Sequence, residues 1–256
     1  MMPDPAPSIS FAGVSKSYAG AAALDDVTLD IAGGSFVALV GSSGSGKSTL
    51  LKTVNRLVVP DRGTVAIDGV DVAARPPHRL RRGIGYVFQD VGLFPHMSVA
   101  ENIAMPLRLE ERSDPQRVAE LLELVELDAA VGHRSPAQLS GGQRQRVGVA
   151  RALASGARLL LMDEPFGALD PVTRDALGHK VRDLHDRLGL TTLMVTHDMA
   201  EALLLADRVL AMAAGRIVAD AAPAALMAGE GGPAAEALLD VPRRQAAALA
   251  TLANGE

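Results

Sequence analysis

The chain has 256 residues, of which 48% are hydrophobic, enough for one large domain or two smaller lobes around a full core. Its 25 basic and 30 acidic residues give a net charge of −5 without a long block of like charge, so no nucleic-acid-binding face is expected. The absence of cysteine excludes disulfide bonds and cysteine-ligated metals.

Residues 1–7 lack the basic and apolar regions of a signal peptide, and we expect them to form a disordered leader. No apolar run approaches the roughly 18 residues that a membrane-spanning helix needs. These features predict a cytoplasmic protein that reaches a membrane only through partners.

The first strands are predicted at 9–11 and 27–31, where apolar and polar residues alternate, and they indicate a small antiparallel β-layer. A glycine turn at 32–34 then leads into the apolar run 36–40, which predicts a buried strand.

A glycine-rich loop follows this strand and fills the pattern G-x-x-x-x-G-K-[ST] at every fixed position with Gly41, Ser42, Ser43, Gly44, Ser45, Gly46, Lys47 and Ser48. Residues 49–52 read as the start of a helix. The inward N–H groups of such a loop, the helix N-terminus and Lys47 together favour a bound phosphate, and Ser48 is placed to ligate Mg²⁺. A flexible Gly/Ser loop would not need a lysine and a hydroxyl residue between a strand and a helix.

Further strands are predicted at 64–69 and 84–88, and helices then dominate. Ser98-x-x-Glu101 is a capping-box pattern, and Asp114-Pro115 supplies an N-cap with proline at the first helical position. The second of these helices carries apolar residues at 118, 121, 122 and 125, so one face needs a partner surface. We expect the segment from about 90 to 155 to form an inserted helical lobe.

The sequence Leu-Ser-Gly-Gly-Gln at 139–143 has the capping-box spacing between Ser140 and Gln143. Gly141 and Gly142 directly after the cap weaken the helix but leave backbone N–H groups accessible, which suits a closely approaching phosphate. This helix start is therefore a second predicted anion site. One nucleotide can use both sites only if folding or dimerisation brings them together.

The apolar run 159–162 predicts a strand that ends in Asp163 and Glu164. Adjacent residues at a strand end point in different directions, which suits Asp163 to the metal and Glu164 to an attacking water. An isolated pair of carboxylates commonly does no more than solvate a strand end. Beside the glycine-rich loop 41–48, a phosphate-binding P-loop, the pair indicates phosphoryl transfer to water.

The chain then returns to an α/β alternation. A helix with Leu177, Val181, Leu184 and Leu188 on one face precedes the strand 191–195, so the sheet should be largely parallel with the phosphate site at the C-terminal strand ends. Beyond residue 219 the chain becomes alanine-rich, and we expect loose helical segments or disorder and no further domain in the tail 221–256.

The P-loop, residues 139–143, the Asp163-Glu164 strand end, residues 168–170 and His197 stand in the order found in ATP-binding-cassette (ABC) ATPases, and the chain resembles this family over residues 8–220. The resemblance implies an α/β P-loop NTPase fold with a mostly parallel core sheet, an N-terminal antiparallel β-layer and an inserted α-helical lobe. It also implies ATP and Mg²⁺ as ligands and a head-to-tail homodimer, in which each ATP lies between Lys47 of one copy and Ser140 of the other.

By this resemblance, the nucleotide-contacting residues are Tyr18 on the adenine, residues Gly41 to Thr49 on the phosphates, and Ser140, Gly141, Gly142 and Gln143 from the second copy. Ser48, Gln89 and Asp163 would organise Mg²⁺. Glu164 would be the general base, Lys47 would hold the β- and γ-phosphates, and His197 would contact the γ-phosphate and the water. Residues 168–170 would form a dimer contact. Tyr18 alone is more often a packing aromatic and Gln89 a polar strand-end residue, whereas the strand 191–195 brings His197 beside the other strand ends.

One P-loop without a membrane segment implies separate integral-membrane permease subunits, with the chain peripheral on the cytoplasmic face of the cell membrane and a substrate-binding protein as an indirect partner. In the family, the apolar segment 90–107 borders a groove that receives short permease helices, so Leu93, Phe94 and Met97 are candidates for transmitting closure.

The transported solute can be inferred only from resemblance. Residues 51–57, 92–97 and 196–202 look most like cassettes that import glycine betaine, choline or related osmoprotectants. Many such relatives carry CBS modules after the cassette, and we expect none in this chain. Two alternatives stay open: import of another small polar solute such as a sulfonate, polyamine or amino acid, and a non-transport ABC ATPase that remodels a protein or ribosome.

Overall fold

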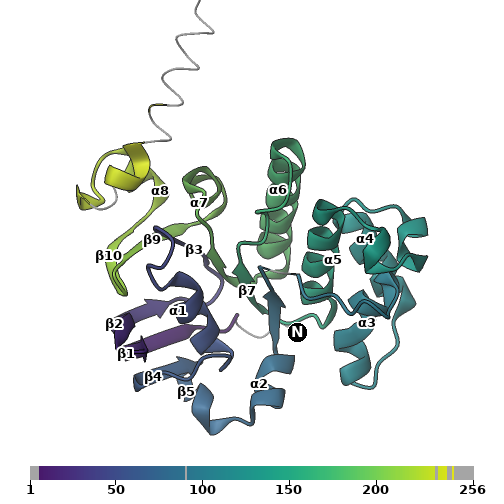
Figure 1. Ribbon diagram of the computed structural model, residues 1–256, viewed down its shortest axis with the longest axis horizontal. Coiled ribbons are helices and arrows are strands. Elements are labelled where there is room, and N and C mark those ends of the chain that lie inside the picture. The colour runs from purple at the N-terminus through teal and green to yellow at the C-terminus, as the bar shows by residue number, and fades with distance from the viewer. Residues whose placement is uncertain (1–5, 90, 234–235, 241–243, 245–256) are drawn as a thin grey trace, which may run out of the picture.

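Two β-sheets form the body of the protein in the computed structural model, which describes residues 6–89, 91–233, 236–240 and 244 (Figure 1). The first sheet has the strand order β2-β1-β4-β5, and every neighbouring pair in it is antiparallel. Its strands are β1 (Ile9–Tyr18), β2 (Ala21–Ile31), β4 (Arg62–Ile67) and β5 (Val70–Asp71). Phe11 is opposite Leu29 on one side and Val65 on the other, and all three are buried. The predicted antiparallel layer is confirmed.

The second sheet has the strand order β10-β9-β3-β8-β7-β6. Its strands are β3 (Phe36–Val40), β6 (Ile84–Val87), β7 (Leu159–Asp163), β8 (Thr191–Val195), β9 (Arg208–Ala213) and β10 (Arg216–Ala221). All neighbours are parallel except β9 and β10. Every residue of β3, β7 and β8 is buried, because both faces of the sheet are covered. The mostly parallel core sheet is thus confirmed, while β9 and β10 extend it beyond the predicted strands.

The alternation of β3 divides the core into two parts. Phe36, Ala38 and Val40 face the cluster built with the helices, whereas Val37 and Leu39 face the cluster built with the antiparallel sheet. The helices that cover these faces are α1 (Lys47–Val54), α2 (Pro77–Arg82), α5 (Gly141–Ala154), α6 (Pro171–Leu188), α7 (Met199–Leu205) and α8 (Pro223–Met227).

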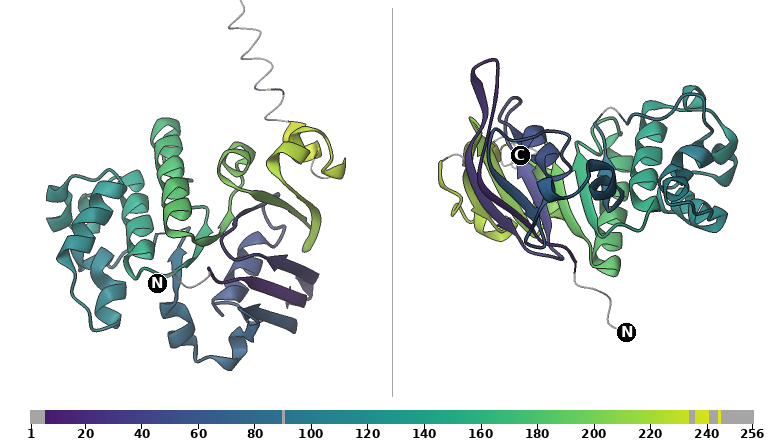
Figure 2. Two further views of the ribbon diagram at one scale, coloured as in Figure 1. Left: turned by 180° about the vertical axis from the view of Figure 1, so that it is seen from behind. Right: turned by 90° about the horizontal axis from the view of Figure 1, so that it is seen from below.

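A group of helices lies to one side of the parallel sheet, at the opposite end of the molecule from the antiparallel sheet (Figure 2). It contains α3 (Val99–Leu109), α4 (Pro115–Leu124) and short 3₁₀ helices at Ala129–His133 and Pro136–Gln138. A further 3₁₀ helix, at Val72–Ala74, follows β5 and lies outside this group. The predicted caps are confirmed: Ser98 and Glu101 form a capping box on α3, and the Asp114 side chain accepts from the Arg117 N–H at 2.9 Å.

Helix α5 connects this helical group with the parallel sheet. A Cβ atom on Gly85 of β6 would lie 2.5 Å from the carbonyl oxygen of Ala152, so strand and helix are in backbone contact. The boundaries 90–155 and 8–220 stay predictions, since the described core runs without a break from the sheets into the helices.

Two details differ from the sequence predictions. Leu188 is 41% exposed, because α6 ends there at the left-handed C-cap Gly189 and does not extend its apolar face. In the tail, Leu226 and Leu239 are buried in the core, while the other described residues from 221 to 240 are exposed or half-buried. Residues 6–7 of the predicted leader have no regular structure, and residues 1–5, 241–243 and 245–256 lie outside the described residues. Within the described chain, no helix is long and apolar enough to cross a membrane.

Candidate active site

The loop between β3 and α1 contains two glycines that the packing requires. Gly41 has φ 148° and Gly46 has φ 105°. A Cβ atom on Gly46 would lie 2.2 Å from the carbonyl oxygen of Ala23, and one on Gly41 would lie 2.2 Å from that of Met212. Any side chain at either position would therefore displace a neighbouring strand. The loop curls tightly enough to leave its backbone open to a phosphate.

Lys47 is held across this loop. Its Nζ donates to the carbonyl oxygens of Gly41 and Ser42, both at 2.8 Å, and the residue is only 6% exposed. Burial lowers the pKa of Lys47, while the nearby carboxylates of Glu164 and Asp163 oppose that shift. The ammonium group is thus fixed in the loop, within electrostatic reach of two carboxylates.

Asp163, at the end of β7, is buried and surrounded by donors. The Ser48 hydroxyl donates to its Oδ1 at 2.6 Å, and the Lys52 Nζ lies 3.0 Å from its Oδ2. The Tyr86 hydroxyl donates to Oδ2 at 3.4 Å, and burial together with the Asp163 charge raises the pKa of Tyr86. Lys52 and Tyr86 are not among the predicted residues. The i, i+4 spacing of Ser48 and Lys52 on α1 is the signal that could have identified Lys52.

The predicted magnesium ligands have the chemistry that Mg²⁺ prefers. Ser48 offers a hydroxyl oxygen, Asp163 a carboxylate and Gln89 an amide oxygen, and Mg²⁺ completes such a set with phosphate oxygens and water. The protein alone does not form a full cage, since the described residues contain no cluster of three or more His, Asp or Glu side chains suited to a metal. The donor set therefore fits a metal that arrives with a phosphate ligand.

Glu164 follows the last residue of β7, and its carboxylate has other partners than that of Asp163. Its Oε2 lies 3.3 Å from the Gln89 Nε2 and 3.3 Å from the His197 Nδ1. Its backbone N–H donates to the Val195 carbonyl at 2.9 Å, which fixes the end of β7 against the end of β8. The carboxylate thus sits between an amide and an imidazole from two other strand ends.

A pocket of about 560 Å³ opens beside the P-loop. It is lined by Ala23 and by nine predicted residues, namely Ser43, Gly44, Gly46, Lys47, Ser48, Thr49, Gln89, Glu164 and His197. Side chains from positions 43 to 197 of the sequence therefore converge on one space, and it combines a lysine, a carboxylate and an imidazole.

Gly41, Ser42, Ser45 and Asp163 are also predicted but do not line this pocket, and two further predicted groups lie outside it. The Tyr18 ring, at the end of β1, is 49% exposed, and the Lys16 Nζ is 5.5 Å from its centroid. Ser140 and Gln143 form the predicted capping box at the start of α5, with N···O distances of 3.0 and 3.1 Å, and Ser140 and Gly141 are exposed. Neither group lines the P-loop pocket.

The segment 168–170 follows Glu164 and leads into α6. The Asp170 side chain accepts from the Thr173 N–H at 3.0 Å and caps α6, and hydrogen bonds with Thr173 lower the pKa of Asp170. Leu169 is buried, with 5% exposure. The predicted dimer-contact segment is therefore anchored within its own chain at both residues.

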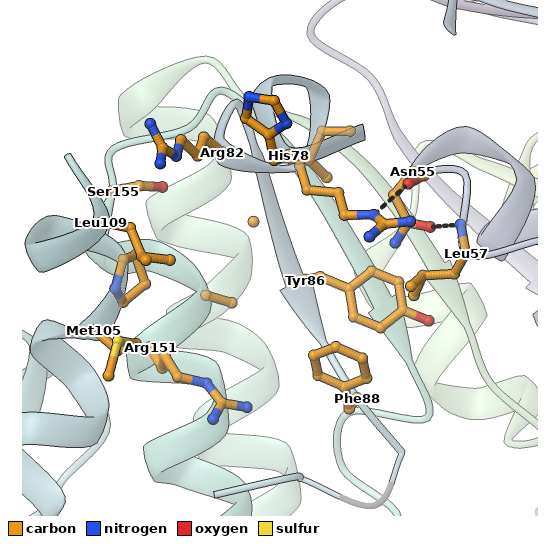
Figure 3. Close-up of a pocket in the computed structure, with 15 residues that line it drawn as sticks. Asn55, Leu57, His78, Arg82, Tyr86, Phe88, Met105, Leu109, Arg151 and Ser155 are labelled. Carbon is orange, nitrogen blue, oxygen red and sulfur yellow. Dashed lines mark hydrogen bonds between the residues drawn. The ribbon is translucent and has the colours of Figure 1, made fainter. Parts of the chain in front are cut away.

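A second cavity, the α2–α3 groove, has a volume of about 420 Å³. Figure 3 shows its walls, formed by Met105 and Leu109 from α3, Tyr86 and Phe88 from the β6 side, His78 and Arg82 at one end, and Arg151 from α5 at the other. Among the described residues that line it, none is acidic. It is an apolar groove with a cationic rim.

Of the residues predicted to border such a groove, Phe94 is 40% exposed and lines a neighbouring cavity that also contains Gln89. Leu93 packs against the core, and Met97 is partly buried. Arg151 joins the two cavities, and its guanidinium donates to the carbonyl oxygens of Val91 and Gly92.

Comparisons with known proteins agree with this geometry. Residues 24–167 match the family described as "ABC transporter". The glycine betaine/carnitine/choline transport ATP-binding protein of Bacillus subtilis (strain 168) is 48% identical over 80% of this chain and 55% of its own length. The sulfate/thiosulfate import ATP-binding protein of Caulobacter vibrioides is 49% identical over 82% of this chain and 63% of its own length. The chain spans about half the length of the first curated relatives it matches.

Among solved structures, the ATP-binding cassette MJ0796, described as dimeric and bound to ADP and Pi in a post-hydrolysis state, has a TM-score of 0.79 and 33% identity. The match covers 84% of this chain and 98% of that cassette. It confirms the expected fold class of an ABC ATPase cassette. The P-loop pocket, the carboxylate pair at its edge and the family match together show that the chain belongs to the ABC transporter family.

Proposed function

We propose that the chain is the ATP-binding and ATP-hydrolysing subunit of an ABC importer. The observation that carries this proposal is the Glu164 carboxylate, which lies 3.3 Å from both Gln89 and His197 at the edge of the P-loop pocket. A carboxylate held between two polar side chains, beside a lysine and a serine–aspartate pair, suits the activation of water for attack on a phosphate.

Each residue of the site has a proposed role. Lys47 supplies positive charge to the β- and γ-phosphates, and Glu164 accepts the proton of the attacking water at Oε1 or Oε2. His197 orients Glu164 and the γ-phosphate. Ser48, Gln89 and Asp163 would hold Mg²⁺, which when bound neutralises phosphate charge. Tyr18 would pack against the adenine.

A second copy of the chain completes the proposed site. Ser140, Gly141, Gly142 and Gln143 begin a helix outside the P-loop pocket, and the exposed N–H end of that helix suits a phosphate carried by another molecule. A head-to-tail homodimer would place this helix start on the partner's nucleotide, and the dimeric state of the similar cassette MJ0796 supports such pairing.

The α2–α3 groove is the proposed contact with permease subunits. Its apolar walls and cationic rim suit a short amphipathic helix, and Arg151 connects it with the residues that follow Gln89. We propose that the chain is peripheral on the cytoplasmic face of the membrane and reaches a substrate-binding protein only through the permease.

Quaternary amines such as glycine betaine or choline are the proposed cargo. The 48% identity to the glycine betaine/carnitine/choline transport ATP-binding protein of Bacillus subtilis supports this choice. Comparable identity to a sulfate/thiosulfate import protein keeps another small polar solute as the second candidate. The cassette touches nucleotide and partner subunits, so its own site carries no cargo chemistry.

The test is uptake of radiolabelled glycine betaine, choline and sulfate in cells that produce the chain with its neighbouring membrane and binding subunits. Glu164-dependent accumulation of a quaternary amine is expected, with Glu164→Gln as the inactive comparison. Accumulation of sulfate alone would replace the cargo and keep the importer. Purification of an active ATPase without any membrane subunit, together with no uptake, would favour a non-transport ATPase.

A further inference from the structure

Gln145 is a buried amide on α5 and is not among the predicted site residues. It lies two residues after the Leu-Ser-Gly-Gly-Gln segment and is only 2% exposed. We propose that Gln145 is a positioning residue that fixes the backbone of Glu164 relative to α5, and this inference rests on the proposed role of Glu164 as the base.

The nitrogen and the oxygen of the Gln145 amide both form hydrogen bonds with the segment that follows β7. Its Nε2 donates to the Glu164 carbonyl at 2.9 Å, and its Oε1 accepts from the Ala168 N–H at 2.8 Å. The reversed orientation of the amide would lose both bonds, so the hydrogen-bond network assigns this one. One side chain thus closes the loop from Glu164 to Ala168.

The bond to Glu164 acts on a residue with unusual backbone geometry. Glu164 has φ 48°, in the left-handed region that residues with a side chain rarely adopt. Such a conformation persists only where surrounding contacts hold it. Its N–H is held by Val195 of β8 and its carbonyl by Gln145, so the two contacts set the direction in which the carboxylate leaves the backbone.

Helix α5 touches the same segment at a second point one turn earlier. A Cβ atom on Gly142 would lie 3.1 Å from the Leu169 Cδ2, so the first turn of α5 packs directly on Leu169. Positions 142 and 145 are three residues apart and share one helix face. The helix that begins with the proposed second anion site is therefore fastened to the segment of the proposed base, and Gln145 provides the hydrogen bonds.

Gln145→Glu and Gln145→Met separate positioning from folding. Glutamate has the same size and keeps an acceptor for the Ala168 N–H but turns an oxygen toward the Glu164 carbonyl, whereas methionine keeps the volume and removes both bonds. The exposed Gln116 of α4 provides a matched control in Gln116→Glu, since its amide donates to Glu120 on the surface of the same helix.

The experiment measures ATP hydrolysis, ATP affinity and binding stoichiometry on the purified full chain, with melting temperature alongside. Both Gln145 variants should lower kcat about tenfold to a hundredfold, the loss typical of a misplaced catalytic group. The Kd and stoichiometry should stay within about twofold of wild type, because the P-loop is untouched. Hydrogen exchange at the Ala168 amide should accelerate in Gln145→Met.

The outcomes are distinct. Wild-type kcat in both variants, with Glu164→Gln inactive, overturns the positioning role and leaves the proposed function intact. A fall in kcat that is matched by an equal fall in nucleotide stoichiometry shows loss of folded protein and also overturns the positioning role. If Gln145→Met does not fold, the kcat of Gln145→Glu decides between the two outcomes. A wild type that does not hydrolyse ATP overturns the proposed function and this inference with it.

Discussion

Replacing Glu164 by glutamine tests the proposed chemistry most directly. Glutamine has the same length and volume, and its amide oxygen can occupy the place of the Oε2 that now lies 3.3 Å from Gln89 and from His197. The Asp163 contacts with Ser48 and Lys52 are on another side of the strand end and remain. The fold and ATP affinity should therefore be retained.

The magnitude follows from the loss of one proton acceptor. A positioned general base contributes about 10²–10⁴-fold, so kcat should fall by that factor. This corresponds to about 2.7–5.4 kcal/mol in activation free energy. With hydrolysis blocked and binding intact, the proposed dimer should make up a larger fraction of the variant than of the wild type when ATP is present.

Phosphate release gives kcat, equilibrium dialysis gives the ATP Kd, and size-exclusion chromatography with ATP gives the dimer fraction. The exposed Glu123 of α4 supplies the control Glu123→Gln, which makes the same charge change at a residue that does not line the pocket. Near-normal turnover in Glu164→Gln, at unchanged Kd, would refute the assignment of Glu164 as the base.

Three further changes probe the loop and the helix cap. Lys47→Ala should weaken ATP binding at least about tenfold in equilibrium dialysis, because it removes the charge that pairs with the phosphates; unchanged affinity would contradict its role. Gly46→Ala should abolish nucleotide binding and lower the melting temperature, since its Cβ would lie 2.2 Å from the Ala23 carbonyl, whereas Gly69→Ala, also at positive φ but with no atom within 4 Å, is the control. Hydrogen bonding to Thr173 lowers the pKa of Asp170, so its capping stabilises the protein above the ordinary carboxyl pKa of about 3.9 and is lost as pH falls through the lower folded-state value. Asp170→Ala should therefore destabilise the protein at pH 7 and much less at the acid end of that range; equal losses in melting temperature at both pH values would argue against the cap.

The buried strands were predictable because their signal is local. Residues 36–40 and 191–195 form strands with the predicted bounds, since a strand covered on both faces reads as an unbroken apolar run. The caps at Ser98, Asp114 and Ser140 were also readable, because a cap needs only residues three positions apart. Within the candidate site, the lining residues at 43, 44, 46, 47 and 48 came from the glycine-rich pattern and Glu164 from the carboxylate pair, whereas Thr49, Gln89 and His197 came from the family resemblance.

The contacts between motifs were not predictable. Tyr86 meets Asp163, and Gln145 reaches Glu164 and Ala168, across separations that no motif spans. The strands β9 and β10 and the burial of Leu226 and Leu239 likewise depend on which surface the end of the described chain covers.

The sequence by itself determined the P-loop and its lysine, the carboxylate pair at a strand end, the helix caps and the family they resemble, because hydrogen bonds and glycine geometry within a few residues decide these features. Only the tertiary structure decided that Gln89, Glu164 and His197 share one pocket, and that Ser140 to Gln143 lie outside it. The order of strands in the parallel sheet brings their C-terminal ends together, and that order depends on packing across the whole chain.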